Sequence, residues 1–201
     1  MTVKTLCRPL LCFLILSCLS CSQPSKSTSS SPAQPQPIKA AEPSASAPET
    51  KVYEVSKEDI TKIPGITSRN ISVKGVKLGD RTRDVDKLLG KPIKTENLPK
   101  LYRSAYENHG IYLDIDRYAG KVNTIYINTN YYKKAKGDLS DLLAHGKLDL
   151  LKKSFGENPV ESTPEPNATM WEYREKGIQF IHLKQAGTAS YTLKLVEPRK
   201  Y

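Results

Sequence analysis

The sequence predicts an α+β protein in which a unit of helix (or helix–helix) and antiparallel strands occurs twice in tandem, behind a disordered N-terminal tether. Three observations predict it: a short apolar run near the N-terminus, a Ser/Pro/Ala/Gln-rich stretch after it, and glycine-centred motifs that recur at nearly constant spacing. We expect a lipoprotein signal peptide at 1–20, the tether at 21–50, a first repeat at 51–135 and a second at 136–201.

The first residues are typical of an export signal. Lys4 and Arg8 precede an apolar stretch at 9–20, which is too short to span a bilayer. The stretch ends in two serine–cysteine pairs, which resembles the bacterial lipoprotein signal, where the cysteine becomes the lipid-modified first residue. Cys18 has the better aliphatic residue upstream, whereas Cys21 gives the more usual length of apolar run. An ordinary cleaved signal with incidental cysteines is the alternative.

Composition excludes several classes of protein. No apolar run reaches the roughly 18 residues of a membrane-spanning helix, which excludes a polytopic membrane protein. All 4 cysteines lie in the first 21 residues, so the folded part has neither a disulfide framework nor a thiol nucleophile. The 21–50 segment contains too little apolar surface to offset the entropy of ordering it. We therefore expect a flexible tether between a lipid anchor and a domain.

The folded part shows internal similarity. A helix-stop motif at 88–92, Leu-Leu-Gly-Lys-Pro, recurs at 154–159 as Ser-Phe-Gly-Glu-Asn-Pro. A tyrosine that leads into the strand region recurs in the same way, as Tyr106 and Tyr173. Because the spacing differs by a single residue, we interpret the chain as one motif written twice.

The sequence of each repeat predicts one or two helices followed by antiparallel strands. Asp80 is the expected N-cap of a first helix that ends at Gly90, and Asp138 is the expected N-cap of a helix that ends at Gly146. Apolar residues that alternate with polar ones predict half-buried strands. A further helix around 148–155 and five strands, at 111–115, 122–127, 170–174, 178–183 and 190–196, complete the expectation.

A family resemblance follows from this order of motifs. The Phe-Gly-Glu-Asn-Pro run at 155–159 and Trp171-Glu172-Tyr173 resemble the SmpA/OmlA (BamE) lipoprotein family. Two such units in tandem resemble the fold of the β-lactamase inhibitor protein. Members of the SmpA/OmlA family are normally single-copy, and the first repeat lacks the tryptophan. The resemblance thus implies a fold, and neither barrel assembly nor lactamase inhibition.

Enzymatic chemistry has little support in the sequence. The 3 histidines lack the spacing of a metal site, and no serine or threonine lies in a nucleophile-elbow motif. Asp114 and Asp116 share a strand face, as a carboxylate pair for acid–base work would. Arg117 and Lys121 nearby favour solvated, paired charges instead. We therefore expect no enzyme, no cofactor and no metal.

Charge and tyrosines point to binding. The net charge is +10 at pH 7, and the chain contains 11 tyrosines but only 3 phenylalanines. Tyrosines on outward strand positions suit an exposed sheet face that recognises a protein. A basic cluster that follows two tyrosines would suit an anionic surface. The candidate binding residues are Tyr112, Tyr131, Tyr132, Lys133, Lys134, Lys136 and Trp171.

Two functions follow as hypotheses. The first is a non-enzymatic envelope lipoprotein that binds a protein partner in envelope assembly or maintenance. The second is an electrostatic binder of anionic envelope polymer or lipid. Export argues against nucleic acid as a partner. We expect the lipid to hold the chain in the outer membrane or at the cell surface rather than in the inner membrane.

Overall fold

The computed structural model describes residues 51–128, 132–185 and 187–200, all of which belong to one compact unit. The expected signal peptide and tether, with Cys18 and Cys21, lie outside the described residues, as does Tyr131. None of the helices in the described ranges has the length and apolar character needed to cross a membrane.

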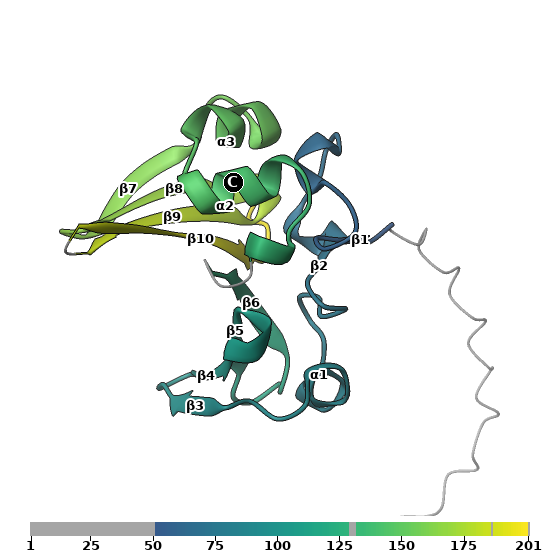
Figure 1. Ribbon diagram of the computed structural model, residues 1–201. Helices are drawn as coiled ribbons and strands as arrows, with labels where there is room; N and C mark the ends of the chain where they lie inside the picture. The colour runs from purple at the N-terminus through teal and green to yellow at the C-terminus, as the bar shows by residue number, and fades with distance from the viewer. Residues whose placement is uncertain (1–50, 129–131, 186, 201) are drawn as a thin grey trace, which may run out of the picture. The chain divides into compact units, whose positions relative to one another are not determined.

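A large antiparallel sheet dominates the fold. Its strands are β3 (Lys94–Asn97), β4 (Leu101–Tyr106), β5 (Ile111–Asp116), β6 (Val122–Ile127), β7 (Val160–Glu165), β8 (Ala168–Tyr173), β9 (Ile178–Gln185) and β10 (Thr188–Val196). All eight are hydrogen-bonded in the order β3-β4-β5-β6-β10-β9-β8-β7. The sheet therefore continues without a break through strands that the sequence analysis had assigned to different repeats (Figure 1).

The α+β class is confirmed, but the prediction of two helix–strand repeats is wrong. The strands β6 and β10 pair in antiparallel fashion, with Ile127 opposite Leu193 and Ile125 opposite Leu195. These four apolar side chains are fully buried, and each contributes about 1.5–3 kcal/mol relative to exposure. Their pairing joins the eight strands β3 to β10 into one sheet, so the fold is mostly sheet rather than two helix–strand units.

The described residues form three α-helices, which correspond to the three helices that the sequence predicts. They are α1 (Thr82–Leu89), α2 (Asp138–His145) and α3 (Leu148–Phe155). Figure 1 shows α2 and α3 on one side of the strands β7 to β10. The segment before α1 adds two short parallel strands, β1 (Tyr53–Glu54) and β2 (Ile71–Ser72), and single 3-10 turns.

Both predicted N-caps are wrong. The N-cap of α1 is Arg81, while the carboxylate of Asp80 accepts the amide of Lys77 at 2.8 Å in the preceding turn. The N-cap of α2 is Gly137, and the amide of Asp138 donates to a distant residue, Asp59, at 3.1 Å. An aspartate far along the chain thus supplies the anion that a helix N-terminus favours.

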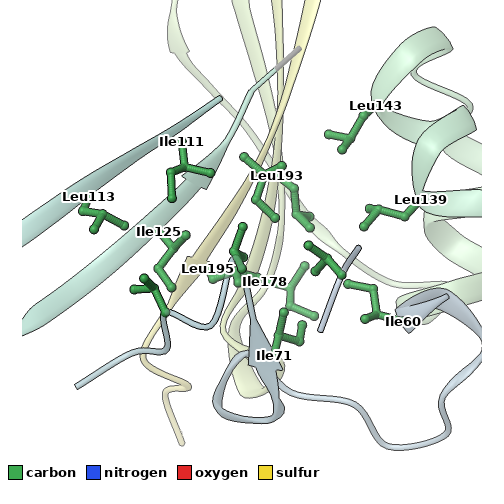
Figure 2. Close-up of a cluster of buried hydrophobic side chains, with 14 of the residues drawn as sticks. Ile60, Ile71, Ile111, Leu113, Ile125, Leu139, Leu143, Ile178, Leu193 and Leu195 are labelled. Carbon is green, nitrogen blue, oxygen red and sulfur yellow. The ribbon is translucent and has the colours of Figure 1, made fainter. Parts of the chain in front are cut away.

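The core lies between the helices and one face of the sheet. Figure 2 shows side chains from the segment before α1 meeting those from α2 and from the two central strands. The labelled residues Ile60, Ile71, Leu139, Leu143, Leu193 and Leu195 are all fully buried. The N-terminal segment therefore completes the core at the β6–β10 junction.

Aromatic rings fill the core under α2 and α3. Tyr191 stacks on Phe180, with ring centroids 5.9 Å apart, and on His182 at 4.8 Å. Gly146, which ends α2 at φ +63°, leaves no room for a side chain, because a β-carbon there would overlap the ring of Tyr191. The close approach of α2 to β10 depends on this glycine.

The two edges of the sheet are polar. All residues of β3, Lys-Thr-Glu-Asn, are exposed. The other edge strand, β7, is exposed at five of six positions and contains Glu161, Pro164 and Glu165. Charges and a proline on an edge strand oppose pairing with another sheet.

A glycine-to-alanine pair tests the contact between α2 and β10. We expect Gly146→Ala to lower the free energy of unfolding by about 1–3 kcal/mol more than Gly65→Ala, because only the first adds overpacking. Gly65 has a similar φ of +66° with nothing within 4 Å, so its substitution carries the backbone cost alone. Urea unfolding of both variants measures the difference. Equal losses of stability would contradict the packing of Gly146 against Tyr191.

Candidate functional site

The described helices cover one face of the sheet and leave the other face without a helix. Ile111, Leu113 and Phe180 point to the side on which α2 contacts Tyr191 and α1 contacts Tyr106. Successive strand residues alternate between faces, so their neighbours point to the opposite side. No described helix packs on that side, which we call the open face.

Polar side chains line up across the middle of the open face. Cross-strand pairing places Arg103 opposite Asp114, and Tyr112 opposite Tyr126. The line continues through residues that share this face on the next three strands. We call the following set the polar row: Arg103, Asp114, Tyr126, Lys194, Gln179 and Glu172.

Three members of the polar row form a closed hydrogen-bonded triangle. Arg103 donates from Nε to Oδ1 of Asp114 at 2.7 Å and from Nη2 to Oδ2 at 3.0 Å. The hydroxyl of Tyr126 donates to Asp114 Oδ2 at 2.7 Å and accepts from Arg103 Nη2 at 3.1 Å. The Asp114 side chain is 7% exposed. A buried carboxylate is tolerable because three charge-assisted donors satisfy it.

The pKa values of this triangle agree with its bonding. The Asp114 carboxylate raises the pKa of the Arg103 guanidinium. Burial, reinforced by the bond to Asp114, raises the pKa of the Tyr126 hydroxyl. The tyrosine therefore stays protonated as a donor, and the triangle keeps one arrangement over the physiological pH range.

A second group occupies the far end of the polar row. Glu172 accepts from Gln179 Nε2 at 2.6 Å and from Arg174 Nε at 2.7 Å. Burial alone would raise the pKa of Glu172, but these two donors outweigh it, and the pKa is lowered. The Gln179 Oε1 atom is buried and has no hydrogen-bond partner among the described residues.

A shallow hollow lies beside the triangle. It has a volume of about 250 Å³ and is lined by Arg103, Tyr112, Tyr126, Asn128 and Thr192. The guanidinium of Arg103 lies 5.0 Å from the centroid of the Tyr126 ring. Two tyrosine rings and a fixed arginine thus surround an open hollow, and these are residue types that dominate protein interfaces.

The structure brings only some of the predicted binding residues together. Tyr112 lies in the open face beside Tyr126. Trp171 lies on the opposite face, where its ring is 6.1 Å from Phe180 and its Nε1 donates to Glu161 at 3.2 Å. The residues Tyr132, Lys133, Lys134 and Lys136 lie outside the sheet, in the connection between β6 and α2.

The carboxylates considered for acid–base work have structural roles. Both oxygens of Asp114 are occupied by Arg103 and Tyr126. Asp116 instead accepts the backbone amides of Tyr118 and Ala119, at 2.8 and 2.6 Å, in the turn after β5. Within the described ranges, no three His, Cys, Asp or Glu side chains gather as metal ligands would.

The sequence analysis missed most of the polar row. Arg103, Tyr126, Lys194 and Gln179 occupy outward positions of strands, which taken singly are typical of solvent-exposed residues. Only the register between neighbouring strands of the sheet aligns them, and one of these pairs, β6 with β10, is distant in sequence. The one available signal was the outward polar alternation of β5 and β6.

Comparisons with known proteins give no identification. No protein-family model, no curated protein and no solved structure matches the chain. The resemblance to the SmpA/OmlA family therefore stays a prediction, and the function has to be argued from the open face itself.

The lowered pKa of Glu172 predicts a pH-dependent contribution to stability. We expect Glu172→Gln to lower the free energy of unfolding at pH 7 by about 1–3 kcal/mol, since a buried charged acceptor is lost. The wild-type advantage is complete above the unfolded pKa of glutamate, about 4.3, and disappears as the pH falls through the lower folded pKa.

Urea unfolding of both proteins between pH 7 and pH 3 measures this difference. Other acidic groups are common to both proteins and cancel. A gap that stays constant over this range would show that the Glu172 carboxylate is not held by Arg174 and Gln179.

Proposed function

We propose that this chain is a non-enzymatic lipoprotein of the bacterial cell envelope that binds a protein partner through the open face of its sheet. One observation carries the proposal: the Arg103–Asp114–Tyr126 triangle is held rigidly on a face that no described helix covers. Because its bonds are already formed, little side-chain entropy is lost when a partner binds.

The chemistry of the open face favours a protein partner. The hollow is shallow and lined by tyrosine rings beside an arginine, whereas small-molecule sites are deeper and enclose their ligands. Tyrosine and arginine are enriched among residues that dominate binding energy at protein interfaces. The two carboxylates nearby, Asp114 and Glu172, are each bonded to an arginine, so neither is available as a general base.

Attachment to a membrane is the second part of the proposal. It is supported by the N-terminal sequence alone, with its apolar run and two candidate cysteines. An acylated cysteine followed by the Ser/Pro-rich stretch would hold the domain near the membrane while leaving the open face accessible. The outer membrane or the cell surface is the proposed location.

Substitution of the two cysteines tests this attachment. We expect metabolic labelling with a fatty-acid analogue to mark the wild-type chain, and one of the variants Cys18→Ser and Cys21→Ser to lose the label completely. The other variant is the matched control. If neither substitution removes the label, or if the wild type takes up none, the lipid anchor is wrong.

The basic cluster supports an alternative function. The side chains of Lys133, Lys134 and Lys136 are exposed, and none forms a salt bridge with a described residue. Such a cluster could bind anionic polymer or lipid, and its binding would weaken steeply with rising salt. The open face carries the first proposal because its side chains are ordered by one another, whereas the lysines are solvated individually.

A pair of tyrosine variants tests the proposed protein interface. We expect Tyr112→Ala to weaken partner binding at least about tenfold, because it removes a ring that lines the hollow. Tyr118→Ala is the control, because Tyr118 is 86% exposed in the turn after β5 and belongs to neither face. The measurement is crosslinked capture from intact envelopes by the full-length chain, at low and at high salt.

The salt dependence separates the two functions. A discrete protein that is retained at high salt, lost with Tyr112→Ala and kept with Tyr118→Ala supports the open face. Material that is lost at high salt, and lost with charge reversal of Lys133, Lys134 and Lys136, supports the alternative. Capture that is insensitive to all of these substitutions contradicts both.

A further inference from the structure

Among the described residues, Lys194 is the cation of the polar row that has no ionic partner. It lies at the centre of the sheet on β10, opposite Tyr126 on β6 and Gln179 on β9. Its side chain is half-buried, and its ammonium lies 5.3 Å from the centroid of the Tyr126 ring. No carboxylate among the described residues lies within salt-bridge distance of it.

The neighbouring carboxylates are already engaged. Asp114 is satisfied by Arg103 and Tyr126, and Glu172 is satisfied by Arg174 and Gln179. Each therefore attracts Lys194 only from a distance, while Arg103 and Arg199 repel it. Burial lowers the pKa of Lys194, as expected for an ammonium that has lost water and gained no close anion.

The charges around Lys194 leave an excess of positive charge. Lys194 interacts electrostatically with two cations, Arg103 and Arg199, and with two carboxylates, Asp114 and Glu172, so its own charge leaves this group with one positive charge in excess. An added carboxylate would offset this excess and would accept the hydrogen bonds that the ammonium does not make within the described chain. The open face is thus electrostatically complementary to an acidic group.

We infer that Lys194 receives an aspartate or glutamate side chain of the protein partner, whose neighbouring apolar or aromatic side chain fills the hollow beside Tyr112 and Tyr126. This inference rests on the proposed function. A protein carboxylate fits better than a phosphate, because the guanidinium of Arg103, the donor suited to grip a phosphate, is committed to Asp114 and Tyr126.

A double-mutant cycle with a selected peptide tests the inference. Random peptides displayed on phage are selected on the full-length chain and retained only if Tyr112→Ala abolishes their binding. We expect the retained peptides to share an acidic residue next to an apolar or aromatic one. Replacing that acid by its amide should weaken binding to the wild type about tenfold and leave binding to Lys194→Met nearly unchanged.

Two controls make the cycle specific. Lys194→Met keeps the aliphatic stem, and its thermal unfolding is compared with the wild type to show that it folds. Lys184→Met removes an exposed lysine that points to the other face of β9, and should behave as the wild type does. Sedimentation with phosphatidylglycerol vesicles tests a lipid phosphate as the ligand of Lys194.

The outcomes separate the inference from the proposed function. If no peptide depends on Tyr112, both are overturned. If the peptides depend on Tyr112 but contain no acidic residue, only the role of Lys194 is overturned. The same holds if replacing the acid by its amide weakens binding to Lys194→Met as much as binding to the wild type. If Lys194→Met abolishes vesicle binding, the anion is a lipid phosphate and the inference is likewise overturned.

Discussion

The pairing of β6 with β10 determines the rest of this structure. Its four central side chains, Ile125, Ile127, Leu193 and Leu195, are fully buried, and they join strands that would otherwise form two smaller sheets. The same pairing brings Tyr126 beside Lys194, so the polar row is continuous across the sheet only because this junction forms. Apolar contacts on one face and polar alignment on the other are thus two results of one register.

The two faces of the sheet differ in how they are stabilised. On the covered face, α2 and the segment before α1 bury isoleucine and leucine side chains at the β6–β10 junction (Figure 2). The open face is organised by charge-assisted hydrogen bonds, in which nearly buried carboxylates are satisfied within the sheet. Side chains that are already fixed by one another lose little conformational entropy on binding, as the proposed function requires.

The sequence predicted the helices and five of the six inner strands, because each of these has a local signal. Gly90, Gly146 and Gly156 end the three helices as expected, and β5, β6, β8, β9 and β10 follow the apolar alternation. The edge strands β3 and β7 were not predicted, because they are polar and exposed, and the inner strand β4 was not predicted either. The sequence did not predict the capping of α2 by Asp59 or the pairing of β6 with β10, because both join residues far apart in the chain.

The candidate site was predictable only in part, for the same reason. Tyr112 could be selected as an outward tyrosine, but its neighbours Tyr126 and Arg103 come from adjacent strands whose register was unknown. Trp171 was selected by its residue type, and strand alternation places it on the covered side. The residue pattern of one strand shows which of its side chains share a face. To know which residues of other strands lie beside them, the register of all the strands is needed.

The long separation between β6 and β10 has a consequence for folding. The strands β7, β8 and β9 and the helices α2 and α3 all lie between them in the chain. Because the chain is synthesised from its N-terminus, β6 has an unpaired, apolar edge until β10 has also been synthesised. Contacts of this kind close late and slowly, so the interval before β10 docks is when the unfinished sheet is most exposed to aggregation.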